Sequence, residues 1–145
     1  MRKSPADKST GFPDEDGIRL AQEIAQYRHL TNRLTRAGHP RLAPLQRTLA
    51  KLLFRQGRIA FARRRYDEAA QSFADAASIE PRRLSYQLAF GRSLLSLGRF
   101  EVAAAQFEKI QDFAPNNHAA GRALAALYRR LGDAEKGRDV LNTLY

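Results

Sequence analysis

The sequence predicts an all-α fold: an α–α superhelix of three helix-turn-helix repeats, preceded by one separate N-terminal helix. Two observations predict it. The chain matches itself over residues 50–145 when it is shifted by 34 positions, and a stripe of large apolar residues at helical spacing runs through residues 17–38. A period of 34 residues is typical of stacked helical hairpins, in which each hairpin buries its apolar face only against its neighbours.

Length and composition are those of one ordinary domain. The chain has 145 residues, 43% of them hydrophobic, and no cysteine, which excludes a disulfide framework, a thiolate metal site and a cysteine nucleophile. Its basic N-terminus is not followed by an apolar run, and no later stretch approaches the roughly 18 apolar residues of a membrane span. We therefore expect a soluble, cytoplasmic protein.

The elements before the repeats follow from local signals. Residues 1–16 are predicted to be a disordered tail, because they are polar and interrupted by prolines. A helix is predicted over residues 17–38, ended by Gly38 and Pro40. We expect it to pack on the first repeat as a cap, to lie in the repeat groove, or to pair with another copy. Its apolar stripe comprises Leu20, Ile24, Tyr27, Leu30 and Leu34.

The repeats begin after a linker, residues 39–49, that leads into the first repeat helix. We divide them as 50–83, 84–117 and 118–145. Small residues recur at two columns, where two helix backbones approach closely, and prolines end the second helix of the first two repeats. The columns pair Gly57 with Gly91, Tyr66 with Phe100, Ala69 with Ala103, Phe73 with Phe107, and Pro81 with Pro115.

On these residues the sequence resembles the tetratricopeptide repeat (TPR) family over about residues 50–145. Family positions are matched by Leu53, Gly57, Ala69, Phe73, Ala76 and Pro81; by Gly91, Leu94, Gly98, Phe100, Ala103, Phe107 and Pro115; and by Leu124, Tyr128, Gly132 and Leu141. Gln87 and Gly121 depart from the first large apolar column, Gln56 stands where leucine is usual, and Gly137 replaces an alanine. Together these departures predict a somewhat loose third repeat.

The net charge of +10 is concentrated in one part of the chain. No acidic residue occurs between Glu23 and Asp67, whereas eleven lysines and arginines do, and the rest of the chain is near neutral. Charge of one sign concerns the partner and not the fold. On a helical wheel, four basic residues of the first repeat helix share an arc of about 80° opposite its apolar side.

The TPR resemblance implies that this arc lines a concave groove that binds an extended peptide or a partner helix. We expect basic residues with apolar islands there. The predicted binding residues are Arg47, Lys51, Phe54, Arg55, Arg58, Phe61, Leu88, Arg92, Leu95, Arg122 and Arg129. Forked guanidinium groups suit carboxylates, and phenylalanines supply apolar anchors. The predicted partner is therefore a protein with an acidic and hydrophobic segment.

Alternatives stay open at this point. The arginines are also consistent with a merely solvated face, and a basic stripe with aromatics is consistent with nucleic acid, although no reading motif is present. A helix followed by three repeats is also similar to the translocator chaperones of type III secretion, which tend to be acidic. The family's clamp for a C-terminal carboxylate is not expected, because its columns hold Phe54, Arg58, Ala89, Ala119 and Ala123.

Enzymatic functions lack the residues they require. The three histidines, at 29, 39 and 118, have no partner at the spacing of a metal pair or a nucleophile relay. The glycines Gly91 and Gly98 lack the Lys-Ser/Thr of a phosphate loop. We therefore predict no catalytic residue, no metal and no cofactor. The last helix is expected to leave apolar surface uncovered and to favour a homo-oligomer, through Leu141, Leu144 and Tyr145.

Overall fold

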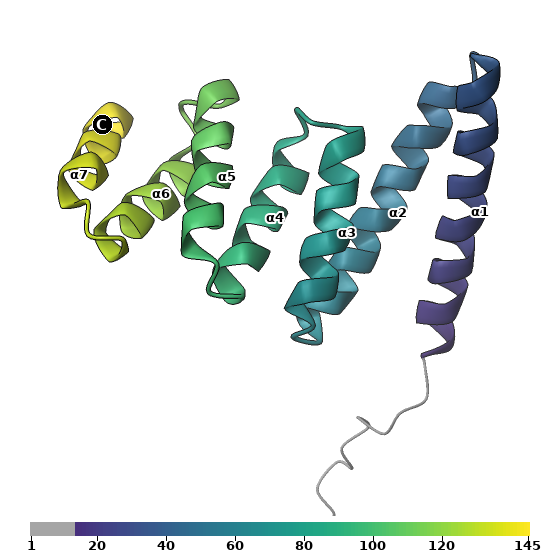
Figure 1. The fold of residues 1–145 in the computed structure, drawn as a ribbon, viewed down its shortest axis with the longest axis horizontal. Coiled ribbons are helices and arrows are strands. Elements are labelled where there is room, and N and C mark those ends of the chain that lie inside the picture. The colour runs from purple at the N-terminus through teal and green to yellow at the C-terminus, as the bar shows by residue number, and fades with distance from the viewer. Residues whose placement is uncertain (1–13) are drawn as a thin grey trace, which may run out of the picture.

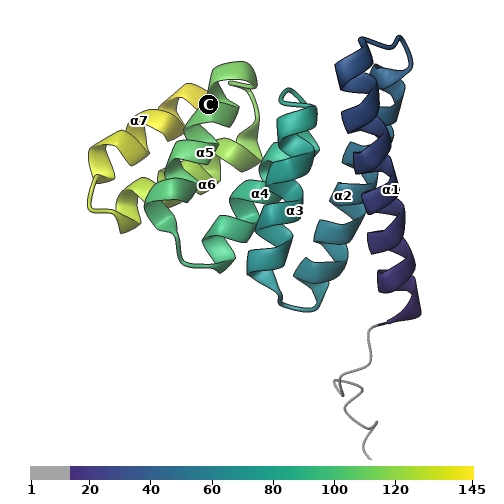
Figure 2. The same ribbon diagram turned by 45° about the vertical axis from the view of Figure 1, so that its right-hand side comes forward.

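A computed structural model describes residues 14–145, which form seven helices and no strand. The helices stack one after another along the chain, and each lies against the next (Figure 1 and Figure 2). They are α1 (Glu15–Ala37), α2 (Leu42–Ala62), α3 (Tyr66–Ile79), α4 (Leu84–Ser96), α5 (Phe100–Phe113), α6 (His118–Arg130) and α7 (Ala134–Leu144).

Three helical hairpins, α2–α3, α4–α5 and α6–α7, follow the single helix α1. This arrangement confirms the predicted fold class. The first helices of the second and third hairpins begin at Leu84 and His118, which are 34 residues apart. α3 and α5 end at Ile79 and Phe113, shortly before the two repeat prolines, because proline disfavours helical conformation in the residue before it.

Each of the first two hairpins closes on a glycine and a phenylalanine. A Cβ atom at Gly57 would lie 2.6 Å from the ring of Phe73, and one at Gly91 would lie 2.8 Å from the ring of Phe107. Both rings are almost completely buried. The absence of a side chain at the glycines therefore lets each ring fit between the two helices of its hairpin.

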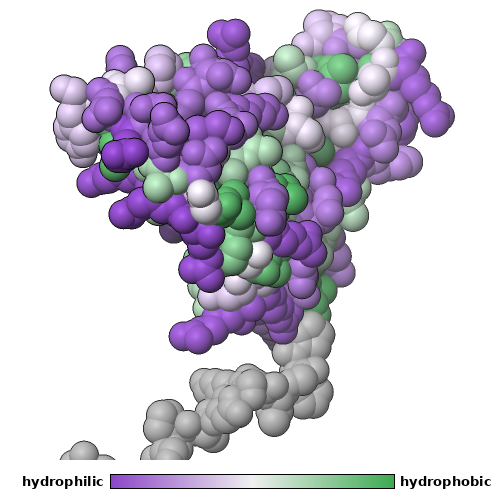
Figure 3. Space-filling view, turned by 60° about the vertical axis from the view of Figure 1, so that its left-hand side comes forward, coloured by the Kyte–Doolittle hydropathy of each residue, from purple (hydrophilic) through white to green (hydrophobic). Residues whose placement is uncertain are grey.

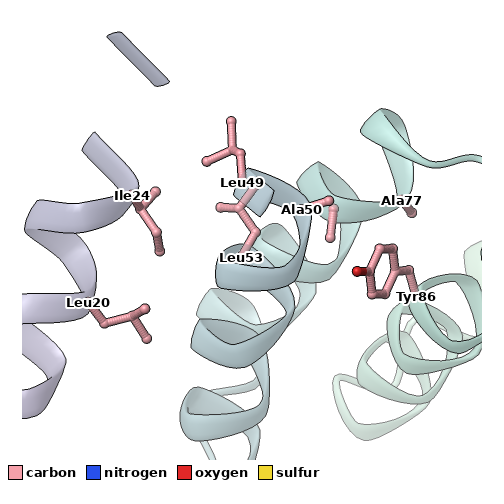
Figure 4. Close-up of a cluster of buried hydrophobic side chains, with 8 residues drawn as sticks. Leu20, Ile24, Leu49, Ala50, Leu53, Ala77 and Tyr86 are labelled. Atoms are coloured by element: carbon pink, nitrogen blue, oxygen red, sulfur yellow. The ribbon is translucent and has the colours of Figure 1, made fainter. Parts of the chain in front are cut away.

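α1 packs on the side of α2 that faces away from the second hairpin. Leu20 and Ile24 of α1 point toward Leu49 and Leu53 of α2 in one buried cluster (Figure 4). Burying a leucine or isoleucine side chain is worth about 1.5 to 3 kcal/mol, so these contacts hold α1 in place. Among the three expected arrangements, the structure shows the cap, and α1 does not enter the groove between α2 and α4.

Two predicted boundaries are wrong. Asp14 caps α1, and Glu15 and Asp16 are helical, so the tail predicted over 1–16 does not include them; residues 1–13 lie outside the described part. α2 begins at Leu42 and takes in most of the predicted linker 39–49. Pro44 does not prevent this, because the first four N–H groups of a helix have no intrahelical acceptor.

Two departures from the family pattern have structural explanations. Gln87 is buried, but its amide donates to the Pro81 carbonyl oxygen at 2.8 Å and its Oε1 accepts from Gln106 at 2.5 Å. A Cβ at Gly137 would lie 2.9 Å from the backbone oxygen of Ala125. α6 and α7 therefore approach closely at Gly137, while the looseness of the third repeat stays a prediction.

Candidate functional site

A cavity of about 400 Å³ lies between α2 and α4, the first helices of the first two hairpins. Its floor is the ring of Phe73, which α3 supplies from below. We call this cavity and its rim the α2–α4 groove. Its lining residues are Phe54, Arg58, Phe61 and Ala62 of α2, Phe73 of α3, and Ser85, Leu88, Ala89 and Arg92 of α4.

The apolar wall of the groove is made by aromatic rings that support one another. The Phe54 ring lies 5.4 Å from the Phe73 ring and 4.9 Å from the Tyr86 ring, measured between centroids. Phe61 meets Tyr66 edge to face at 5.0 Å. Such ring pairs contribute about 0.5 to 1.5 kcal/mol beyond the area they bury. The wall is therefore held in place while part of Phe54 and Phe61 stays open to solvent.

Two arginines flank this apolar surface, one from each helix. Arg58 on α2 and Arg92 on α4 occupy the same column of the repeat, 34 residues apart, and both are exposed. The Arg58 guanidinium lies 6.0 Å from the centroid of the Phe54 ring, within cation–π range. Neither arginine takes part in an ion pair with any residue of 14–145. Both charges therefore remain available to a ligand.

Arg47, Lys51 and Arg55 extend the positive charge along the exposed side of α2. None of them forms an ion pair within the described residues, and none lines the cavity. The rest of the basic stretch is partly neutralised. Arg63 binds Asp14 at 2.5 Å and Arg28 binds Asp75 at 2.8 Å. Because these acids lie far away in the sequence, the count of eleven uncompensated basic residues overstates the number whose charge is free in the folded protein.

Five of the eleven predicted binding residues line the groove, and six do not. The five are Phe54, Arg58, Phe61, Leu88 and Arg92. Leu95 is half-buried against the core of the second hairpin, and Arg122 and Arg129 are exposed on α6. These three and Arg47, Lys51 and Arg55 lie outside the cavity.

Sequence reasoning missed four lining residues: Ala62, Phe73, Ser85 and Ala89. Phe73 was assigned to the hairpin core, yet one side of its ring also forms the groove floor. The small residues at 62, 85 and 89 leave the space that makes a cavity. Projecting α4 onto a helical wheel beside α2 would have placed Ser85 and Ala89 next to Leu88 and Arg92.

Apolar surface is also exposed elsewhere on a largely hydrophilic molecule. On the face drawn in Figure 3, apolar side chains gather at the centre and hydrophilic ones surround them.

At the C-terminal end, Leu141 is half-buried and Leu144 packs on Gly121, whereas Tyr145 is 84% exposed beside His118. α7 exposes mainly polar side chains, so less apolar surface is free there than we expected, and self-association stays a prediction.

Among the described residues, two tyrosines have a pKa that departs clearly from its usual value. Burial raises the pKa of Tyr86, which stands behind the groove wall, and Arg83 lowers that pKa in part. Burial, together with a hydrogen bond to Glu108, raises the pKa of Tyr128 to about 12. Both groups are therefore neutral near pH 7.

Within residues 14–145, no three His, Asp or Glu side chains gather where they could share a metal ion, and no helix is long and apolar enough to cross a membrane.

The sequence matches no family model and no curated protein. Among solved structures, the chain is similar to MamA. A MamA point mutant aligns with a TM-score of 0.61 at 22% identity and covers 83% of this chain and 94% of the other. MamA from the strain MSR-1 also gives 0.61 at 22% identity, covering 91% and 78%, and a MamA fragment from Desulfovibrio magneticus RS-1 gives 0.60 at 19%, covering 83% and 73%.

At these identities the similarity concerns the fold alone. It confirms the helical-repeat architecture, while membership of the TPR family stays a prediction that rests on the matched columns.

Proposed function

We propose that this chain is a protein-interaction module without enzymatic activity that binds an acidic and apolar segment of a partner protein in the α2–α4 groove. One observation carries the proposal: an apolar cavity is flanked on both walls by arginines that no acid of residues 14–145 neutralises. We also propose a cytoplasmic location and an adaptor or assembly role.

The two parts of the groove favour two parts of one ligand. A large apolar side chain placed over Phe73 gains about 1.5 to 3 kcal/mol from burial. A carboxylate beside Arg58 or Arg92 gains a charge-assisted hydrogen bond, which is about twice as strong as a neutral one. Because neither gain alone gives useful affinity, the ligand that the groove selects carries both groups close together.

Nucleic acid fits this geometry less well. Phosphate contacts need basic side chains along a continuous path. Arg58 and Arg92 line a mainly apolar groove from different helices, and Arg47, Lys51 and Arg55 lie outside the cavity. Aromatic platforms for bases need exposed ring faces, and here the Phe54 and Phe61 rings are half-buried against other rings. A secretion chaperone remains a special case of the proposed module, since it too would bind its cargo in such a groove.

A peptide-binding experiment tests the proposal. Fluorescence anisotropy would follow a labelled synthetic peptide that alternates leucine or phenylalanine with glutamate, beside a matched peptide with glutamine in place of glutamate. We expect the acidic peptide to bind at least roughly tenfold more tightly, since tenfold corresponds to about 1.4 kcal/mol. The double variant Arg58→Glu, Arg92→Glu should lose this binding.

The matched control places the same charge change outside the groove. In Arg122→Glu, Arg129→Glu, two exposed arginines of α6 are reversed, and we expect less than roughly a threefold loss because surface charges act weakly over distance. Equal losses in both double variants would show that only net charge matters. Equal binding of the two peptides by the wild type would overturn the acidic ligand.

A further inference from the structure

Four helix ends in this molecule share one backbone arrangement. In each, the N–H of the residue with positive φ donates to the carbonyl oxygen three positions back and the N–H of the next residue donates to the one five positions back, which is the Schellman pattern. At the end of α2, Arg64 N donates to Phe61 O at 2.9 Å and Arg65 N to Ala60 O at 2.9 Å. The ends of α1, α4 and α6 repeat both bonds, with donors at 38 and 39, 98 and 99, and 132 and 133.

At three of these helix ends the residue with positive φ is a glycine, and at the end of α2 it is an arginine. Gly38, Gly98 and Gly132 have φ values of 58°, 71° and 89°, and Arg64 has a φ of 60°. Left-handed backbone brings Cβ too close to the following carbonyl oxygen, so every residue except glycine is strained there. Arg64 is the one non-glycine residue of 14–145 with positive φ, and it stands where glycine would relieve the strain.

The folded chain itself makes little use of the Arg64 side chain. It is exposed and forms no ion pair within the described residues. A positive charge near a helix C-terminus is favourable, but Arg63 and Arg65 already supply it and are held by Asp14 and Glu68. The nearby acid Asp67 pairs with Arg99.

Arg64 lies close to the α2–α4 groove along the chain. Phe61 and Ala62, two of the last residues of α2, line the groove, and Arg64 follows in the turn that ends this helix. Arg64 itself does not line the groove but borders a separate pocket with Arg65, Tyr66, Asp67, Glu68 and Leu97. Arg58 in the groove and Arg64 in the turn both form no ion pair within the described residues.

We propose that Arg64 is a specificity contact for the binding partner: it binds a carboxylate of the acidic segment where that segment leaves the α2–α4 groove. This inference rests on the proposed function. It explains why a strained backbone position carries a long cationic side chain, since residues in strained conformations persist where they serve a function. The partner is a protein segment with acids beyond its apolar anchor.

The test separates stability from binding at one residue. Replacing Arg64→Gly relieves the strain, so the melting temperature should rise by roughly 2 to 4 °C. The same variant should bind the leucine–glutamate peptide roughly three- to fivefold more weakly, as expected for one exposed charge pair. Arg64→Lys should keep the affinity within roughly twofold, because it keeps the charge.

Two controls come from the same chain. Gly98→Arg recreates the strain at the end of α4 and should lower the melting temperature by a similar amount without raising peptide affinity. Arg82→Gln removes an exposed charge from the α3–α4 connection and should leave the affinity unchanged. An Arg64→Gly protein that is more stable and binds as tightly as the wild type overturns the inference, and so does an equal loss in Arg82→Gln.

Two other outcomes also count against the inference and can be told apart. If the wild type binds no acidic peptide, the proposed function fails together with the contact that depends on it. If Arg64→Gly instead weakens retention of a single-stranded oligouridylate while peptide binding stays constant, the partner is a nucleic acid and the peptide contact is refuted.

Discussion

The surface between α2 and α4, which holds the cavity, and the surface between α4 and α6 are built on the same repeated backbone but carry different side chains. Phe73 underlies the first and Phe107 occupies the same column beneath the second. The first wall has aromatic residues on both sides of Arg58, whereas the equivalent column residues on α6 are Arg122, Ala126 and Arg129.

The hairpin repeat therefore keeps the shape of the array constant, while the three columns that contain Phe54, Arg58 and Phe61 change from one repeat to the next. Core columns are constrained by packing between helices, while the exposed columns are free to differ from one repeat to the next.

The largest expected effect comes from removing the buried ring that lies beneath each of these two surfaces. Phe73→Ala and Phe107→Ala should each destabilise the protein by about 3 to 5 kcal/mol, because both rings are buried and leave a cavity. Urea denaturation monitored by circular dichroism would measure both. Only Phe73→Ala should also weaken the acidic peptide, since Phe73 is the groove floor.

The expected difference between the two surfaces is contradicted if Phe73→Ala and Phe107→Ala lose peptide binding equally under conditions where each variant remains folded. Such a result would mean that the surface between α4 and α6 takes part in binding as much as the α2–α4 groove does.

Placing two side chains of α4 at the equivalent positions of α6 tests the same difference. We expect this change to affect peptide binding and to have little effect on stability. Arg122→Leu combined with Ala126→Arg gives α6 the residues that α4 presents at Leu88 and Arg92. Both positions are exposed, so stability should change by less than about 0.5 kcal/mol. We expect a second peptide site of affinity within roughly tenfold of the first, seen as a doubled stoichiometry in titration calorimetry.

An unchanged stoichiometry in a folded double variant would show that side chains at these columns do not suffice, and that the geometry of the α2 wall is also needed. Arg122→Gln alone serves as the control, because it removes the charge without supplying the apolar wall.

The smallest effect concerns Tyr128, which links α6 to Glu108 of α5 on the C-terminal side. The folded protein raises the pKa of Tyr128 from 10.0 to about 12. Its contribution to stability is therefore complete below pH 10 and is lost as the pH rises toward 12. Tyr128→Phe should remove this dependence, so the stability difference between wild type and variant should shrink between pH 10 and pH 12.

Chemical denaturation at several pH values, with the ultraviolet absorbance of tyrosinate as a second readout, would measure this. A difference that stays constant across the range would show that burial and the Glu108 contact do not raise the pKa of Tyr128 in the folded protein. Glu108→Gln is the matched control, because it keeps an acceptor and removes the charge.

Local chemistry made much of the fold predictable. The period of 34, the glycine and phenylalanine columns and the two prolines specify where the hairpin helices meet and end, and these are short-range effects. The start of α2 was missed because Pro44 was taken as part of a linker, although proline is tolerated within the first turn of a helix.

About half of the candidate site was predictable, and the reason for the other half is geometric. A wheel of α2 places four basic residues, Arg47, Lys51, Arg55 and Arg58, in one arc flanked by Phe54 and Phe61, and of these six only Phe54, Arg58 and Phe61 line the cavity. The wheel could not show that α4 lies beside this arc at a distance that leaves a cavity above Phe73. The closeness of α6 and α7 at Gly137 was unpredictable for the same reason, since it depends on the path of a second helix.

By itself, the sequence determined an all-α array of three hairpins after one helix, with an excess of positive charge near its start. Only the tertiary structure decided which of those charges are free. Asp14 neutralises Arg63 from 49 positions away, and Arg64 is strained because its helix ends as the glycine-ended ones do. Helix periodicity acts over a few residues, whereas charge pairing and cavity formation depend on side chains that meet only after the chain has folded.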